Sequence, residues 1–550
     1  MRLHPISKVI EATHNLPFLF LLLLVACVAA NAGSSSASGA AASVPADIQA
    51  VFNKPVYRNA IWGLRVVDPG TGSVLVDLRP DHQFFIGSVR KIFSVGALLE
   101  QIGPQHTYDT RVYRQGQMDS GGILHGDLIL VASGDLTMGG RTNPDGSVAI
   151  SDYDHNEADS LGNAKLTAPD PLAGYLAIAK QVAAKGIKQI TGDVVIDDRL
   201  FQPYTFRNEF DLKPIFVNDD VVDLIINPTT NGNPASVAWR PHSAALSVQN
   251  AVTTSGPGSR YSLQVNSEFP KCIGMPGCTG RIGGNLPMDF VPPFTNQFPL
   301  VQTFRIVQPS NYARTVLIET LQASGVRVGA APVAQNPVQL LPPRNSYQPD
   351  VMVANLTGLP FSEDAKLVLK VSYNMGADTS LLLYGLTQGV DNMTAALAAE
   401  QTNLAANYGV PKNEYVFVDG SGGGPTTATN SAVTQFLIDM TGRATFPVFF
   451  DALPVLSVDG SLSFVTGFKS DSTLAGAAGR VHAKTGTFVS GSSSGLLVKG
   501  QALGGYINTR SGKRLVFQLV VNNVPVTSLN DVIQVFQDQG KISAILWRDN

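Results

Sequence analysis

The segment that most constrains the fold is residues 89–100, which read VRKIFSVGALLE. Its side chains are apolar almost all round a helical circumference, and a helix of that kind has to be buried inside its domain. Ser88 then lies in the first turn of this helix, three residues before Lys91. Because residues three apart share one face of a helix, the Ser88 hydroxyl and the Lys91 amine can touch. The segment therefore predicts a buried helix with an adjacent serine and lysine at its start.

The composition is typical of a packed protein with many turns. The chain has 550 residues, of which 44% are hydrophobic and 15% charged, as expected of a globular and not a disordered protein. This length allows two or three domains. The 52 glycines and 34 prolines indicate many turns, and therefore many strands. A formal net charge of −3 gives no basic surface for nucleic acid, so we expect no nucleic-acid partner.

Residues 1–32 have the pattern of an export signal. Basic residues precede an almost wholly apolar segment, 16–28, and an Ala-Asn-Ala run at 30–32 offers small residues for cleavage. The apolar core is shorter than the roughly 20 residues needed to span a bilayer. Residues 33–44 follow as a flexible tether of small residues. We therefore expect an exported protein of the periplasm or cell envelope, with no retained transmembrane helix.

The two outer parts of the remaining chain, 45–104 and 351–550, mix helical and strand patterns. The segment 61–78 reads as a hairpin, 364–385 is helical in pattern, and a second hairpin turns at 510–512. The sequence therefore predicts one α+β domain assembled from both outer parts.

The stretch between them, 105–350, is rich in Gly, Pro, Asn and short strand-like runs. By pattern, its one long amphipathic helix is 170–186, and we find no internal repeat. We expect it to be a strand-rich insertion of one or two lobes that splits the α+β domain in sequence.

Three short motifs carry the candidate chemistry. A serine hydroxyl such as that of Ser88 is a weak nucleophile until a base takes its proton, and a neutral lysine can be that base. The run Ser372-Tyr373-Asn374 places a hydroxyl and an amide two residues apart on a loop between helices. The run Lys484-Thr485-Gly486-Thr487 reads as a strand, in which alternate side chains share a face. There a lysine can offer a cation to an anionic substrate, and the glycine lets backbone come close.

Each motif is weak alone, because serine is a common helix N-cap and the other two fit an ordinary loop and strand. Together, in this order, they are the motif set of penicillin-binding proteins and class A β-lactamases. The chain resembles the penicillin-binding proteins, and most closely the D-alanyl-D-alanine carboxypeptidase/endopeptidase family of penicillin-binding protein 4 type, peptidase family S13. Runs such as GDLILVASGDLTM, FVDGSGGGP and AGRVHAKTGTF share in the resemblance. The 284 positions from Ser88 to Ser372 leave a gap too long for a compact β-lactamase.

The resemblance implies a penicilloyl serine transferase domain, of β-lactamase/transpeptidase-like fold, that works through a covalent acyl-enzyme. Ser88 would attack the carbonyl between two D-alanines, Lys91 would accept its proton, and Ser372 would relay a proton to the leaving amine. The substrate-binding residues that it implies are Asn374, Lys484, Thr485, Gly486 and Thr487. It implies peptidoglycan peptides ending in D-Ala-D-Ala as substrates, β-lactam antibiotics as covalent inhibitors, and neither a metal nor an organic cofactor. The insertion would carry none of the covalent chemistry.

Alternatives from the same residues are a serine β-lactamase or esterase of the same fold and a non-catalytic cell-wall-binding protein. Tyr373 departs from the Asp or Asn that the family often has there, and its side chain need not point into the site. His482, two residues before the third motif, is either a substrate contact or a packed strand residue. Three acidic residues that suit turns better than a metal site are Asp193, Asp197 and Asp198.

The chain has three cysteines. Cys272 and Cys278 enclose a Gly- and Pro-containing turn, and an exported chain meets an oxidising compartment, so we expect a disulfide between them. Cys27 ends a run that resembles a lipoprotein signal, which makes a lipid anchor through Cys27 the alternative to ordinary cleavage after Ala32. Soluble relatives are usual in the family, which favours ordinary cleavage. The balance between carboxypeptidase and endopeptidase action and the oligomeric state stay open.

Overall fold

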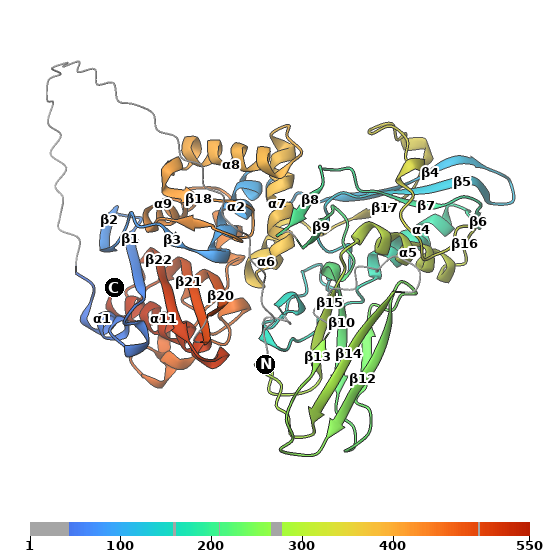
Figure 1. The fold of residues 1–550 in the computed structure, drawn as a ribbon. Helices are drawn as coiled ribbons and strands as arrows, with labels where there is room; N and C mark the ends of the chain where they lie inside the picture. Colours follow the sequence, from blue (N-terminus) through green and yellow to red (C-terminus); the bar gives the residue numbers. More distant parts are fainter. Residues whose placement is uncertain (1–42, 158–160, 208, 266–277, 493–494) are drawn as a thin grey trace, which may run out of the picture.

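The computed structural model describes residues 43–157, 161–207, 209–265, 278–492 and 495–550. Two lobes lie side by side (Figure 1): the blue and orange-to-red parts of the chain form the first, and the cyan-to-yellow part forms the second. The expected signal segment and most of the tether lie outside the described residues. Within those residues, no helix has both the length and the apolar character needed to cross a membrane.

The first lobe contains a five-stranded antiparallel sheet in the order β2-β1-β22-β21-β20. Its strands are β1 (Ile61–Asp68), β2 (Ser73–Leu78), β20 (Val481–Ser492), β21 (Gly495–Asn508) and β22 (Arg514–Val526). The pairing of β1 with β22 joins the two ends of the chain in one sheet. Both predicted hairpins, β1–β2 and β21–β22, are confirmed.

The sheet separates two cores. Successive side chains of a strand point to opposite faces, and along β22 Val516 and Val520 belong to one core whereas Phe517 and Leu519 belong to the other. The second of these cores is covered by α1 (Ala46–Phe52) and α11 (Leu529–Asp549). The first is filled by a layer of helices, which carries the candidate chemistry.

That layer surrounds α2 (Lys91–Ile102), which is buried from Lys91 to Leu99 and packs on α6 and α7. The other helices of the layer are α6 (Phe361–Lys370), α7 (Asn374–Thr387), α8 (Met393–Asn407), α9 (Asn430–Met440) and α10 (Phe446–Asp451). The predicted burial of this helix is confirmed, but its predicted start at Val89 is early. Ser88 lies in a 3-10 turn, η2 (Gly87–Arg90), because the chain enters the helix through a tighter turn, as is frequent at helix N-termini.

The second lobe has its own core and begins with a sheet in the order β16-β6-β5-β4-β17, with β7 paired to β5. Its strands are β4 (Asp109–Met118), β5 (Ile123–Val131), β6 (Gln189–Ile190), β7 (Val194–Asp197), β16 (Arg327–Val328) and β17 (Met352–Thr357). Because β17 pairs with β4, this sheet continues past the expected boundary at residue 350.

Two helices, α4 (Ala173–Ala184) and α5 (Pro309–Ala323), pack against each other and this sheet. The helix predicted at 170–186 is confirmed as α4. The sequence pattern missed α5 because polar side chains interrupt its buried face, although Asn311, Glu319 and Gln322 lie on its more exposed side. Its buried polar side chains, such as Arg314 and Thr320, are satisfied by hydrogen bonds.

Below this sheet lie two three-stranded sheets, one of β10, β11 and β15 and one of β12, β13 and β14 (Figure 1). Their strands are β10 (Val221–Asn227), β11 (Ser236–Arg240), β12 (Ser247–Ser255), β13 (Gln264–Val265), β14 (Thr279–Pro287) and β15 (Leu300–Arg305). Shorter strands are β3 (Phe84–Phe85), β8 (Tyr204–Phe206), β9 (Phe210–Leu212), β18 (Tyr415–Val416) and β19 (Thr427–Ala428). The β8–β9 hairpin packs Phe206 and Phe210 into the helical core of the first lobe, so the two lobes share a core where they meet.

Candidate active site

The first motif places its serine and lysine in direct contact. Lys91 opens α2, and Ser88 lies in the preceding turn η2. Lys91 Nζ donates to Ser88 Oγ at 2.6 Å, and Lys91 is buried. A base within this distance of a hydroxyl is placed to remove its proton. The predicted approach of the two side chains is therefore observed.

Three further acceptors surround Lys91 Nζ. They are Asn374 Oδ1 at 2.6 Å, the carbonyl oxygen of Ser421 at 3.0 Å and Ser372 Oγ at 3.4 Å. A lysine side chain has at most three N–H donors, so these contacts and that to Ser88 cannot all be full hydrogen bonds at once. The acceptors hold the amine in place beside the Ser88 hydroxyl.

Ser372 connects the two motif lysines. Lys484 Nζ of the third motif donates to Ser372 Oγ at 2.9 Å. Lys91 Nζ of the first motif lies 3.4 Å from the same oxygen. Ser372 lies between α6 and α7 with a backbone φ of 64°, in the left-handed region. A non-glycine residue held there costs on the order of 1–3 kcal/mol and persists only where its surroundings impose it. The strained turn therefore places one hydroxyl between two amines.

The third motif lies on β20, at the edge of the sheet nearest to η2. Lys484 is buried and also donates to the carbonyl oxygen of Thr485 at 2.9 Å. The Thr485 hydroxyl lies 2.8 Å from that of Ser461 and accepts a long contact of 3.5 Å from Lys484 Nζ. The exposed Thr487 donates its hydroxyl to Gln501 Oε1 at 2.7 Å.

Two glycines let β20 lie against the turn that carries Ser88. A Cβ on Gly486 would overlap the carbonyl oxygen of Ile86 and would lie 2.9 Å from the backbone nitrogen of Val89. Gly87 has a φ of 50°, and a Cβ there would lie 3.1 Å from the backbone nitrogen of Thr487. The sequence predicted that Gly486 lets backbone come close. The backbone that it admits belongs to the turn of Ser88.

The chain thus brings a serine, two lysines, a second serine and an amide into one hydrogen-bonded group from three distant motifs. Residues 44–538 match the D-Ala-D-Ala carboxypeptidase 3 (S13) family. The chain belongs to this family. The predicted serine D-Ala-D-Ala carboxypeptidase of peptidase family S13 is thereby confirmed.

Known relatives agree with this assignment. The D-alanyl-D-alanine carboxypeptidase of Actinomadura sp. (strain R39) is 26% identical over 497 residues, covering 86% of this chain and 80% of that protein. Penicillin-binding protein 4 from Haemophilus influenzae superposes with a TM-score of 0.65 at 16% identity, covering 91% of this chain and 99% of that chain. The same protein, complexed with a novel β-lactam, superposes with a TM-score of 0.61 at 17% identity over the same shares. The likeness to these structures concerns the fold, and it confirms the predicted α+β class.

Sequence reasoning assigned no role to the loop 419–424 of this S13 enzyme, although the loop supplies the Ser421 carbonyl to Lys91. Asp419 shapes the loop by accepting hydrogen bonds from the backbone of Ser421, Gly422 and Gly423. The carboxyl of Asp378 accepts a further one from Gly420 at 2.9 Å. The run of glycines was the available signal, but a carbonyl contact has no side-chain signature.

Buried charges support this loop. Arg90 donates to Glu400 at 2.9 Å through Nη1 and to the carbonyl oxygen of Asp419 at 2.9 Å through Nε. Arg90 therefore points away from the Ser88–Lys91 pair. Burial raises the pKa of Glu400, although Arg90 opposes the shift. Burial, together with the nearby Asp419, raises the pKa of Asp378 to about 8.

The other candidates lie outside this group. His482 stacks on Phe450 with ring centroids 4.0 Å apart, and burial lowers its pKa, so it is a packed strand residue. The three acidic residues of the insertion form ion pairs, in the order Asp193 with Arg314, Asp197 with Arg199 and Asp198 with Lys213.

Cys278 is buried and disulfide-bonded. Cys272 and Cys27 lie outside the described residues, so the predicted pairing stays a prediction.

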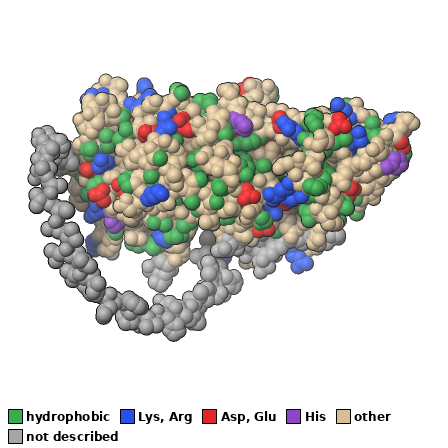
Figure 2. Space-filling view, turned by 90° about the horizontal axis from the view of Figure 1, so that it is seen from above, with side chains coloured by type: hydrophobic (Ala, Val, Ile, Leu, Met, Phe, Trp, Pro, Cys, Tyr) green, Lys and Arg blue, Asp and Glu red, His purple; other side chains and the backbone are tan. Residues whose placement is uncertain are grey.

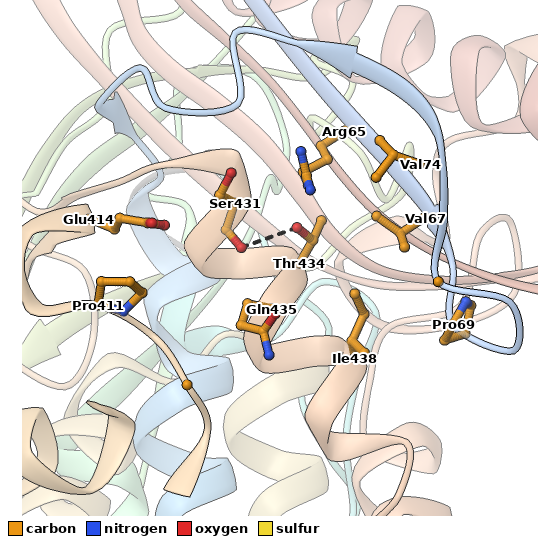
Figure 3. Close-up of a pocket in the computed structure, with 12 residues that line it drawn as sticks. Arg65, Val67, Pro69, Val74, Pro411, Glu414, Ser431, Thr434, Gln435 and Ile438 are labelled. Carbon is orange, nitrogen blue, oxygen red and sulfur yellow. Dashed lines mark hydrogen bonds between the residues drawn. The ribbon is translucent and has the colours of Figure 1, made fainter. Parts of the chain in front are cut away.

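Two cavities lie elsewhere. One of about 390 Å³ lies between the β1–β2 hairpin and α9 and is lined in part by Arg65, Glu414 and Gln435 (Figure 3). These three side chains are already engaged, with Asp77, Thr429 and the Tyr408 carbonyl respectively. A second, open cavity of about 530 Å³ is lined by insertion residues between 143 and 168. Neither is lined by a motif residue.

Proposed function

We propose that this S13 enzyme cleaves the bond between the two D-alanines of peptidoglycan stem peptides, and that Ser88 carries the acyl group. The observation that carries the proposal is the 2.6 Å contact between Lys91 Nζ and Ser88 Oγ, inside a group that also contains Ser372 and Lys484. Ser88 Oγ attacks the carbonyl carbon of the penultimate D-alanine while its proton passes to neutral Lys91. The protonated Lys91 then passes this proton through the Ser372 hydroxyl to the leaving nitrogen, D-alanine departs, and water hydrolyses the ester on Ser88.

The arrangement of the lysines supports a neutral Lys91. Lys91 and Lys484 both contact Ser372 Oγ, so a positive charge on either one disfavours a positive charge on the other. Lys484 has the role that needs the charge, which is to hold the terminal carboxylate of the substrate. We infer that Lys484 keeps its proton and that Lys91 gives its own up before acylation.

Backbone groups complete the proposed site. The N–H groups of Ser88 and Thr487 would stabilise the oxyanion that forms on the attacked carbonyl. The turn and the strand that carry them are held together at Gly87 and Gly486. Donors fixed before the reaction need no reorganisation as charge develops.

We expect Lys484→Met to lower discrimination in favour of substrates with a free terminal carboxylate. A hydrogen bond to a charged group contributes about 1.5–3 kcal/mol, which corresponds to roughly 10- to 100-fold in rate. The measurement is kcat/KM for a D-Ala-D-Ala peptide and for the same peptide amidated at its C-terminus. The wild type should prefer the acid, and the variant should lose most of that preference.

A control for this test is Lys499→Met. Lys499 is exposed on β21, where it lies over the rings of Phe85 and Phe488. The substitution removes a cation of the same sheet from a residue that has no described contact with Ser372. It should keep the preference for the acid. Equal hydrolysis of acid and amide by the wild type would exclude the proposed role of Lys484.

We propose that β-lactams acylate Ser88 and that the resulting acyl-enzyme is hydrolysed slowly. Penicillin carries a strained amide and a carboxylate, which match the groups that Ser88 and Lys484 would engage. A purified sample treated with fluorescent penicillin should stay labelled, and a D-Ala-D-Ala pentapeptide should release D-alanine. Rapid turnover of penicillin without peptide hydrolysis would favour a β-lactamase instead. A cross-linked dimer peptide in the same assay measures endopeptidase action.

We further propose that the protein is exported and cleaved after Ala32. The support is the basic, apolar and small-residue pattern of residues 1–32. Mass spectrometry of the mature N-terminus is expected to find Gly33. A diacylglyceryl-modified Cys27 would replace this proposal with a lipid anchor.

A further inference from the structure

The side chains of the second motif alternate between the two lobes. Ser372 and Asn374 point to Lys91, as described above. Tyr373 and Met375 point into the insertion instead. Tyr373 is 1% exposed, and its ring meets that of Phe216 edge-on with centroids 6.4 Å apart. Met375 Sδ accepts a weak hydrogen bond from the guanidinium of the insertion residue Arg305 at 3.9 Å.

An unusual turn of the insertion follows Phe216. Asn218, Asp219 and Asp220 are consecutive, and their φ values are 51°, 54° and 57°. Asn and Asp enter the left-handed region more readily than most residues, but normally one at a time. Each costs on the order of 1–3 kcal/mol, so the surroundings have to hold the turn in this shape.

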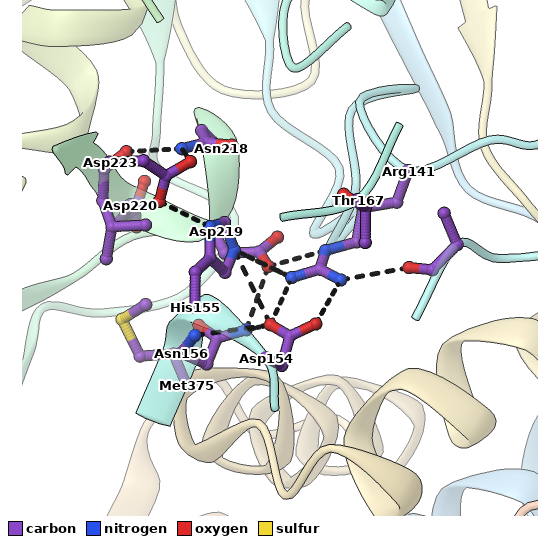
Figure 4. Close-up of polar contacts among 12 residues, drawn as sticks. Arg141, Asp154, His155, Asn156, Thr167, Asn218, Asp219, Asp220, Asp223 and Met375 are labelled. Carbon is purple, nitrogen blue, oxygen red and sulfur yellow. Dashed lines mark hydrogen bonds and ion pairs between the residues drawn. The ribbon is translucent and has the colours of Figure 1, made fainter. Parts of the chain in front are cut away.

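A buried ionic cluster holds it (Figure 4). We use this name for Arg141, Asp154, His155, Asp219 and Asp223, all of which are buried. Arg141 donates to Asp219 at 2.7 Å through Nε and to Asp154 at 2.7 Å through Nη2. His155 bridges Asp219 Oδ2 at 2.9 Å and Asp223 Oδ1 at 2.8 Å. Asp219 is therefore the residue of the turn that both Arg141 and His155 contact.

The cluster supplies its own cation, Arg141. Ligand atoms of Asp154, His155 and Asp219 lie within 4.8 Å of one another, a spacing that could suit a metal ion. However, Arg141 Nη2 contacts all three of these side chains, so the guanidinium stands where an ion would. Burial opposes protonation of His155, but the carboxylates of Asp223 and Asp219 raise its pKa to about 9. The buried ionic cluster therefore has a structural role.

The turn is joined to Tyr373 through Phe216, which lies two residues before Asn218 and packs on the Tyr373 ring. Burial raises the pKa of the Tyr373 hydroxyl well above its usual value, and the charge of Asp219 is the next cause. The backbone oxygens of Asp219 and Asp220 accept from Arg305, which also contacts Met375. The turn and Met375, which directly follows the second motif, thus both contact the partly buried Arg305.

We propose that Asp219 is a positioning residue of the active site: through the ionic cluster it holds the left-handed turn 218–220 against Tyr373 and Met375, and so keeps Ser372 and Asn374 against Lys91. The insertion then contributes to the reaction without touching the reacting atoms. This inference rests on the proposed acylation of Ser88. Ser372 is itself strained at φ 64°, so loss of its support lets it relax away from the two lysines.

The test is Asp219→Asn, with Asp193→Asn as the matched control. Asparagine keeps the size and the left-handed tolerance of the side chain and removes the charge. The control breaks another arginine–aspartate pair of the same lobe, in which the buried Arg314 donates to the partly exposed Asp193 at 2.9 Å. Arg314 lies on α5 and Asp193 just before β7, and neither has a described contact with Tyr373 or Met375. Tm reports the loss of stability, and the second-order rate constant for penicillin acylation reports the active site.

We expect Asp219→Asn to slow acylation about 10- to 100-fold, because a displacement of about 1 Å costs up to 100-fold. Asp193→Asn should stay within about twofold of wild type at a temperature well below both Tm values. An Asp219→Asn rate within twofold of wild type, or an equal loss in both variants, would overturn the inference. Absence of acylation in the wild type would count against the proposed function instead.

A second pair of variants covers the case in which Asp219→Asn does not fold. Within the described residues the Tyr373 hydroxyl has no hydrogen-bond partner, so Tyr373→Phe should acylate within about threefold of wild type. Tyr373→Ala removes the ring that the turn supports and should lose about as much as Asp219→Asn is expected to lose. Wild-type rates in the alanine variant, or equal losses in both variants, would show that the ring does not transmit the support.

Discussion

Ser88→Ala is expected to abolish covalent labelling by fluorescent penicillin and to lower peptide hydrolysis on the order of 10⁶-fold. The oxygen that would form the acyl ester is lost, and no other described hydroxyl accepts from Lys91 at so short a distance. The fold should survive. Lys91 keeps its contacts with Asn374, Ser372 and the Ser421 carbonyl, so the buried amine is not left without partners.

The measurements are intact-protein mass after treatment with penicillin and release of D-alanine from a pentapeptide. Circular dichroism and Tm serve as the control that the variant is folded. Undiminished labelling would show that another residue carries the acyl group. A loss of only tenfold in hydrolysis would also argue against Ser88, because removal of a true nucleophile costs far more.

Lys91→Met is expected to slow acylation by penicillin and by peptide together, by about 10²- to 10⁴-fold. The methionine side chain nearly fills the space of lysine but cannot take the Ser88 proton. The loss should fall on the rate of acylation and should not depend on whether the peptide ends in an acid or an amide. This separates Lys91 from Lys484, whose variant is expected to change that preference.

Lys54→Met is a matched control for this variant. Lys54 donates to Asp538 at 2.6 Å, on the other side of the central sheet from Lys91. The Lys54→Met substitution removes a lysine from an ion pair of the same domain and leaves the three motifs unchanged. Its acylation rate should stay within about twofold of wild type. If Lys91→Met is acylated as fast as the control, Lys91 is not the base.

Much of the site could be expected from the sequence because its groups are side chains in short, local patterns. The Ser88–Lys91 contact follows from helical spacing, and the run Lys484-Thr485-Gly486-Thr487 reads as a strand. That the three motifs meet, however, came from the resemblance to a known family. No spacing argument connects Ser88 with Ser372 across 284 positions.

Other parts could not be predicted because they depend on backbone or on distant partners. The Ser421 carbonyl leaves no trace in residue type. The helix α5 has no clear apolar stripe in sequence, because buried polar side chains such as Arg314 and Thr320 are satisfied inside the lobe. Arg141 and Asp219 come from separate segments, and each would read alone as an ordinary surface charge.

The sequence by itself determined the family, the α+β class, the three motifs and the buried helix that begins beside Ser88. These properties depend on residue identity and local periodicity, and both can be read from the sequence without knowledge of the fold. Only the tertiary structure decided that Ser372 is held in a left-handed conformation between two lysines, and that Tyr373 is turned into the insertion. The reason is that strain and buried charge are stable only where distant segments compensate for them, and that compensation exists only in the folded chain.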